Sequence, residues 1–94
     1  MLNQVVLVGR LAKEIEIIED KKVAKMVLAV PRNFKNADGE YDKDFIPCIL
    51  YNGIAENTIE YCKQGDLVGV KGRIQLQDEI EIIAEKITFL SNKK

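Results

Sequence analysis

Two stretches of the chain carry aromatic side chains that could contact a ligand. Phe34 lies between Arg32 and Lys35, and Tyr51 closes an apolar segment that begins at Phe45. An exposed aromatic ring can stack on the flat face of any nucleobase, which contributes about 1 to 3 kcal/mol per base. Lysine and arginine can neutralise the phosphates beside that base. The combination is typical of a surface that binds a nucleic-acid strand.

Each aromatic residue also has a purely structural interpretation. A single tyrosine at the end of a strand, such as Tyr51, is more often a residue at the rim of the core than a ligand contact. Phe34 has polar neighbours on both sides, which makes a core position harder to explain. From the residues alone, Phe34 is the stronger candidate, and both interpretations stay open for each of the two residues.

Three further basic residues are expected to point outward by the alternation of side chains along a strand. In the segment 67–76, the apolar even positions are expected to point into the core: Val68, Val70 and Ile74. This alternation turns Lys71 and Arg73 outward, and the same argument places Arg10 on the face opposite Leu7 and Leu11. A solvated charge is the default interpretation for each of the three, and contact with a phosphate is the alternative.

The balance of charge does not by itself indicate a polyanion partner. Fourteen basic and fifteen acidic residues give a net charge of -1, so affinity for a nucleic acid must come from charges gathered on one face. An acidic cluster lies near the C-terminal end: Asp78, Glu79, Glu81 and Glu85. Because this cluster would repel a phosphate backbone, we interpret it as a solvated face.

The residues offer little for catalysis or metal binding. With no histidine to act as a base, the usual triads cannot be built around a hydroxyl such as Thr58. The glycines of Val68–Gly72 have neither of the spacings that cradle a nucleotide phosphate. Cys48 and Cys62 cannot complete a four-ligand zinc site without histidine, and we expect both to be reduced core residues. The sequence therefore predicts no enzymatic activity, no metal and no cofactor.

Length and composition indicate one globular domain over residues 1–94. Hydrophobic residues make up 47% of the chain and charged residues 31%, close to the averages for globular proteins. No apolar run approaches the roughly 20 residues that cross a bilayer, and no secretory leader is recognisable at the start. We expect a cytoplasmic protein with no membrane contact.

Apolar and β-branched residues mark five expected strands: Asn3–Leu11, Val23–Val30, Phe45–Tyr51, Leu67–Leu76 and Glu79–Leu90. Glu14–Ile18 is expected to be extended, and Pro31 to end the second strand. The polar segment Arg32–Asp44 is expected to be a protruding loop, turning at Asp38-Gly39. Apolar residues at helical spacing after Asn52 predict a short helix.

This order, with one short helix between the third and fourth strands, is the connectivity of the OB-fold. We therefore predict an all-β, five-stranded OB-fold barrel. Barrels of this kind bind oligonucleotides, oligosaccharides or other proteins, so the fold alone does not decide the function.

Long blocks of the chain resemble the bacterial single-stranded DNA-binding protein family: MLNQVVLVGRL, LAVPRNFKN, DGEYDKDF, AENTIEYCKQGDLVGVKGRIQ and AEKITFL. The resemblance spans nearly the whole chain in the family's order. It implies an OB-fold core that binds single-stranded DNA without sequence preference and without catalysis, in DNA replication, recombination or repair. It also implies that Phe34 and Tyr51 occupy positions where the family carries base-stacking aromatic residues.

The chain departs from the family pattern at several positions. The family's long basic hairpin between the last two strands is missing, because Gln75 leads almost directly through Asp78 into Glu79. Lys21 and Lys22 stand as substitutes for the family's Arg-aromatic pair before the second strand. Fewer phosphates can then be neutralised, and we expect a modest, salt-sensitive affinity.

The apolar segments and the family resemblance also predict the binding partners of the chain. Segments that are apolar on both faces predict a homo-oligomer, for which the resemblance favours a tetramer over a dimer. The family's acidic tail docks other proteins, whereas this chain ends in Asn92, Lys93 and Lys94, so we expect no tail-borne recruitment. The alternative function is an OB-fold protein-assembly module of a primosome or phage replication complex with weak DNA binding. Salt-dependent affinity for DNA discriminates the two.

Overall fold

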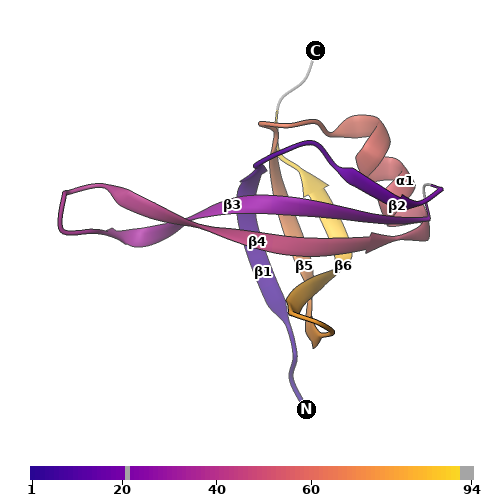
Figure 1. Cartoon of the computed structure of the whole chain (residues 1–94), viewed down its shortest axis with the longest axis horizontal. Helices are drawn as coiled ribbons and strands as arrows, with labels where there is room; N and C mark the ends of the chain where they lie inside the picture. The colour runs from indigo at the N-terminus through magenta and orange to yellow at the C-terminus, as the bar shows by residue number, and fades with distance from the viewer. Residues whose placement is uncertain (21, 92–94) are drawn as a thin grey trace.

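The structure is a computed structural model that describes residues 1–20 and 22–91. Within these residues the chain forms six strands and one helix (Figure 1): β1 (Val5–Leu11), β2 (Glu16–Glu19), β3 (Val23–Lys35), β4 (Tyr41–Tyr51), α1 (Asn52–Tyr61), β5 (Leu67–Leu76) and β6 (Ile80–Phe89). Four residues for which the sequence raised expectations lie outside the described part: Lys21, Asn92, Lys93 and Lys94.

Five of these strands close into a barrel. The order in the sheet is β1-β5-β6-β4-β3-β2, and pairing of β1 with β3 closes the ring. The ladders are antiparallel except between β4 and β6, where Cys48 lies opposite Ile82 in a parallel pair. The helix connects β4 to β5, which are the third and fourth strands of the barrel. This arrangement is the predicted OB-fold, with the extended segment near Glu16 added to β3 as the short strand β2.

Alternation along the strands fills the barrel. Large residues that are fully or almost fully buried come from four strands: Leu11, Met26, Leu28, Leu50, Val68 and Val70. On β1, Leu7 and Leu11 pack inward on the face opposite Arg10, as predicted, and Val6 and Val8 are exposed. Cys48 is a fully buried core thiol and Cys62 is half-buried against the core. The described helix has neither the length nor the apolar character to cross a membrane.

The second expected strand does not end at Pro31. β3 continues through Pro31 to Lys35, and β4 begins at Tyr41, so most of the expected loop is a two-stranded ribbon that projects from the barrel (Figure 1). Pro31 lies opposite Lys43, beyond the last pair that joins β3 to β1. At this point β3 is paired with β4 on one side and has left β1 on the other, so its second edge is open. The missing N–H of Pro31 can face this open edge, where no donor is needed. The turn at Gly39 is confirmed, because this glycine has a φ of 82°.

Strand β5, the fourth strand of the barrel, is irregular at Gly72. The β5–β6 ladder has a bulge between Lys71 and Gly72, and a Cβ added at Gly72 would lie 2.1 Å from the carbonyl oxygen of Ile83. Ile74 does not point into the core as expected: it is 45% exposed. Beyond Gly72 the strand has left its pairing with β1, so the inward face of β5 opens to solvent. The side chain of Asn3 instead brackets the backbone of Ile74 with two hydrogen bonds of 2.9 Å.

Candidate nucleic-acid interface

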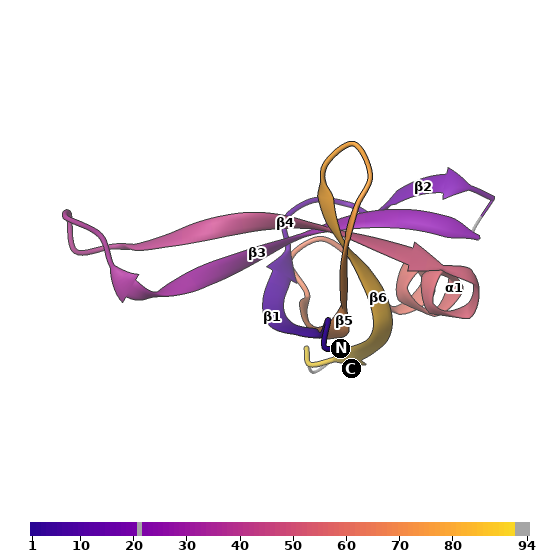
Figure 2. The same cartoon turned by 90° about the horizontal axis from the view of Figure 1, so that it is seen from below.

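One face of the β3–β4 pair points away from the core. Directly opposed residues of an antiparallel pair share a face, and the even-numbered residues of β3 from Ala24 to Leu28 are buried. The opposite face, here called the outer face, carries the odd-numbered residues of both strands: Val23, Lys25, Val27, Ala29, Pro31, Lys43, Phe45, Pro47, Ile49 and Tyr51. The outer face lies on the side of β3 and β4 away from α1 (Figure 2).

Four aromatic rings are accessible along this pair of strands. Phe34 and Phe45 are each 62% exposed, Tyr41 is 55% exposed beside Lys35, and Tyr51 is 39% exposed. Phe45 and Tyr51 are six positions apart on the outer face, which separates them by about 20 Å at 3.4 Å per residue. Phe34 lies farther out on β3, near the tip of the ribbon. Each ring therefore leaves a flat surface open to a stacking partner.

Phe45 is a candidate that the residue patterns did not single out. It lies in an apolar run in which either face could have been the core face, so a buried position was equally compatible with the sequence. The alternation signal was present, because Phe45 and Tyr51 are both odd-numbered and must share a face. What the sequence lacked was the register that turns this face outward.

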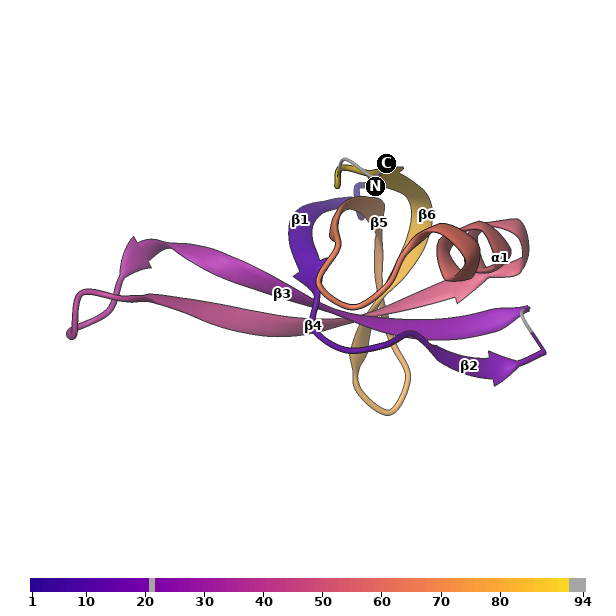
Figure 3. The same ribbon diagram turned by 90° about the horizontal axis from the view of Figure 1, so that it is seen from above.

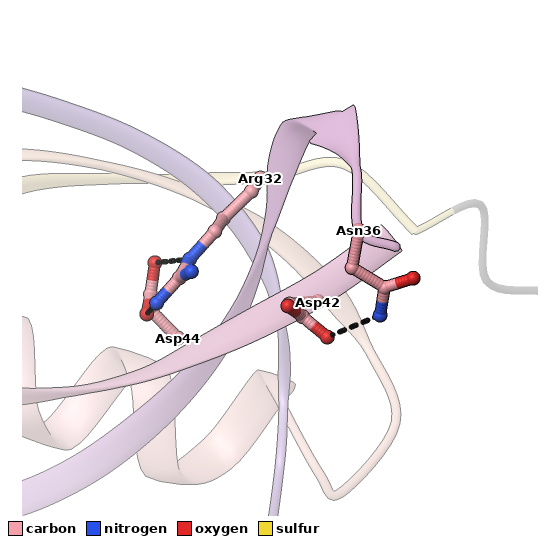
Figure 4. Close-up of polar contacts among 4 residues, drawn as sticks. All are labelled: Arg32, Asn36, Asp42 and Asp44. Carbon is pink, nitrogen blue, oxygen red and sulfur yellow. Dashed lines mark hydrogen bonds and ion pairs between the residues drawn. The ribbon is translucent and has the colours of Figure 1, made fainter. Parts of the chain in front are cut away.

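The ribbon that carries Phe34 is held in shape by polar contacts (Figure 4). Arg32 forms two hydrogen bonds with the carboxylate of Asp44, of 3.1 and 2.9 Å. Hydrogen bonding to Arg32 lowers the pKa of Asp44, and the same contact raises the pKa of Arg32. Arg32 is thus exposed but already paired, so a phosphate would have to share it or displace Asp44.

Asn36 organises the tip of the same ribbon. Its Nδ2 donates to Asp42 Oδ1 at 2.9 Å, and its Oδ1 accepts from the backbone N–H groups of Asp38 and Glu40 at 2.8 and 3.0 Å. One side chain therefore closes both the turn and the strand that returns from it. Beside the turn, Lys35 Nζ lies 5.9 Å from the ring centroid of Tyr41, within cation–π range.

Two more cations join the outer face through a row that crosses four strands. Arg73 on β5 lies opposite Ile83, Ile83 opposite Ile49, and Ile49 opposite Lys25. Ile49 and Ile83 are buried at the centre of this row, although they face away from the main core. The row therefore places Arg73 and Lys25 on either side of a small apolar base. Lys25 was not among the residues predicted from the sequence.

Arg10 and Lys71 occupy different places. Arg10 lies opposite Ala29, which is opposite Phe45, so this guanidinium borders the outer face. Its Nη1 donates to the backbone oxygen of Gly65 at 3.1 Å. Lys71 lies between Val6 and Lys86 on the surface formed by β1, β5 and β6. The structure does not bring Lys71 together with the aromatic rings.

No group of three or more His, Cys, Asp or Glu side chains within the described ranges is arranged to hold a metal ion. The arrangement can instead stack flat rings and attract anions along one side of a strand pair. It offers many non-specific contacts and few that could read the edge of a base.

Comparison with known proteins agrees with this description. The model of the single-strand binding protein family matches residues 2–90, and the chain belongs to that family. A similar relative is single-stranded DNA-binding protein B of Bacillus subtilis (strain 168), 42% identical over 99% of this chain and 94% of the relative. Single-stranded DNA-binding protein 3 of Listeria innocua serovar 6a is 41% identical over 100% of this chain and 67% of that protein.

The fold is also shared with a solved structure. The crystal structure of a small single-stranded DNA-binding protein from Streptomyces coelicolor superimposes with a TM-score of 0.73. The match covers 95% of this chain and 94% of that chain at 18% sequence identity, which establishes a common barrel. The OB-fold prediction is thereby confirmed.

Proposed function

We propose that this chain binds single-stranded DNA without sequence preference and without catalysis, in DNA replication, recombination or repair. The observation that carries the proposal is the set of exposed rings of Phe34, Phe45 and Tyr51 along one strand pair, with cations beside them. Stacking tolerates any base because every base has a flat face. The family match and the exposed rings support this function over the alternative of a protein-assembly module.

The phosphate contacts come from the basic residues around these rings. Arg10, Arg32 and Lys35 border the outer face or its ribbon, and Arg73 belongs to the row that crosses it. Lys71 lies apart from the rings, between Val6 and Lys86, so its contribution is expected to be the smallest. Since the net charge is -1, these local contacts rather than long-range attraction would provide the affinity.

The test is a titration of a fluorescently labelled oligo(dT) with the intact chain at several salt concentrations. Log K should fall linearly with log salt, with a slope of roughly 0.7 per phosphate neutralised. A duplex of the same length is the control, because its bases are stacked on one another and unavailable to the rings. Equal affinity for strand and duplex, or a flat salt response, would contradict the proposal.

A homo-oligomer is part of the proposal. Val6 and Val8 are exposed on β1 beside Lys71, Lys86 and Leu90, where β1, β5 and β6 form a continuous surface. A second copy of the chain is the natural cover for this surface, because a two-fold axis would pair like strands. We favour a tetramer built from such dimers, with a dimer as the alternative.

A further inference from the structure

The two cations of the cross-strand row are each held by a carboxylate of the acidic cluster. Lys25 Nζ lies 3.5 Å from Glu79 Oε2, and Arg73 Nε lies 3.5 Å from Glu85 Oε2. The sequence led us to interpret this cluster as a solvated face that would repel a phosphate backbone. In the folded chain, two of its carboxylates instead pair with cations of the candidate DNA-binding face.

The fold explains how Glu79 and Glu85 reach these cations. The β5–β6 turn that carries Glu79 crosses the plane of β3 and β4 and projects on the side away from α1, as Figures 2 and 3 show from opposite directions. Glu85 is the extra residue of the β-bulge in β6. Lys71 lies opposite Lys86 and the next residue, Gly72, lies opposite Ala84, so no residue of β5 lies directly opposite Glu85. Both carboxylates are thus brought to the outer face by irregular parts of one hairpin.

A bound DNA strand would meet these pairs directly. A phosphodiester and a carboxylate are both monoanions with oxygen acceptors, so they compete for the same ammonium or guanidinium group. Exposed ion pairs shift an equilibrium by only about 1.5- to 5-fold, so a phosphate held nearby by stacked bases can displace the carboxylate. Arg73 also donates a hydrogen bond of 2.7 Å to Gln75 Oε1. Because this amide oxygen carries no net charge, it does not repel a phosphate.

We propose that Glu79 and Glu85 are built-in competitors of the DNA backbone, and that Lys25 and Arg73 bind phosphates once those carboxylates are displaced. This inference rests on the proposed function and adds one phosphate-binding residue, Lys25, and two residues that weaken binding. The hairpin therefore sets the affinity of the chain for a single strand without touching a base.

The experiment compares oligo(dT) binding by the wild-type chain, Glu79→Gln and the double variant Glu79→Gln/Glu85→Gln. Each substitution keeps the shape of the side chain and removes its charge. We expect about a two- to fivefold gain in affinity at low salt for each carboxylate removed. The salt slope should stay near that of the wild-type chain, because Lys25 and Arg73 neutralise the same phosphates in each complex. The matched control is Glu56→Gln, which removes one charge from α1 on the far side of β3 and β4.

A double-mutant cycle with Lys25 separates local competition from general charge repulsion. In a Lys25→Met background, the gain from Glu79→Gln should disappear if Glu79 acts by holding Lys25. A gain of the same size in both backgrounds, or an equal gain from Glu56→Gln, would overturn the inference. If the wild-type chain binds oligo(dT) and Glu79→Gln binds it with the same affinity, the inference is overturned and the proposed function stays intact. Binding by none of the proteins would overturn both.

Discussion

Phe34, Phe45 and Tyr51 keep much of their rings in solvent, although burying an aromatic side chain would contribute to folding. We expect Phe45→Ala to weaken oligo(dT) binding by about 1 to 3 kcal/mol, because one stacking surface is lost. The melting temperature should change little, because most of the Phe45 ring is exposed to solvent and little packing is lost with it. Titration and thermal unfolding of the same preparation check both parts.

A matched control exists on the other side of the barrel. Phe89 is also partly exposed, but its ring lies 6.1 Å from that of Tyr61 at the end of α1. Phe89→Ala should leave DNA affinity unchanged. If Phe45→Ala lowered stability as much as affinity, Phe45 would be a packing residue and the outer face would lose its central ring.

Cys48 gives a chemical measure of how closed the core is. Burial raises the pKa of its thiol to about 12, so very little thiolate exists near neutral pH. Because the thiolate is the nucleophile, Cys48 should resist alkylation at pH 8 in the folded chain and react once the chain is unfolded. Mass spectrometry of peptides labelled with and without denaturant measures this. Rapid labelling of Cys48 in the native chain would mean that the barrel opens readily.

At the scale of elements, the β3–β4 ribbon depends on Asn36 rather than on a hydrophobic core. We expect Asn36→Ala to free the tip, because three hydrogen bonds that join the turn to its strands are lost. DNA binding should weaken by roughly 1 kcal/mol, about fivefold, since Phe34 must then be ordered on binding. The global melting temperature should stay nearly constant, as expected for local opening.

The comparison for this variant is Asn33→Ala in the same ribbon, because the side chain of Asn33 makes none of the hydrogen bonds found in the described part of the chain. Hydrogen exchange should accelerate around the turn in Asn36→Ala and remain unchanged in Asn33→Ala. Equal behaviour of the two variants would show that Asn36 does not organise the tip.

The same ribbon shows what the residues could and could not reveal. Periodicity located the barrel strands and the helix, because buried faces leave a repeating apolar pattern. Pro31 was interpreted as an end, since a proline cannot donate to a ladder, but the ribbon has an open edge where no donor is needed. Ile74 lies on the strand face that the alternation predicted, and it is still exposed. Alternation predicts which face of a strand a side chain occupies, but it does not predict where along its length the strand leaves the barrel.

The residues of the candidate site also fall into two groups, those that the sequence could reveal and those that it could not. Exposed aromatic and basic residues in polar surroundings, such as Phe34 and Arg32, were recognisable one at a time. Phe45 and Lys25 required the register of the sheet, which decides the face that points outward. The pairing of Lys25 with Glu79 joins residues far apart in the chain, so no local pattern could indicate it.

For the whole molecule, the exposed valines of β1 belong to the apolar surface that we expect a second copy of the chain to cover. We expect light scattering at micromolar concentration to give the mass of a tetramer or dimer for the wild-type chain. Val8→Glu should shift the mass towards the monomer, because a buried carboxylate without a partner opposes association. Ile17→Glu on β2 is the control, since it places the same charge on another exposed apolar position. A monomeric wild-type chain would contradict the prediction.

The length of the β3–β4 ribbon also has a consequence for how densely the protein can coat a strand. From Tyr51 to Tyr41 the outer side of β4 runs ten residues, about 34 Å at 3.4 Å per residue. We expect the length of this side of β4, ribbon and barrel part together, to set the number of nucleotides that one subunit occludes, within the roughly 4 to 16 known for OB-fold domains. Replacing residues 32–43 by a two-residue turn should leave the barrel folded and reduce the occluded length. Stoichiometric titration of poly(dT) at low salt would show this as more subunits bound per strand, and an unchanged stoichiometry would mean that the barrel alone sets the spacing between neighbours on DNA.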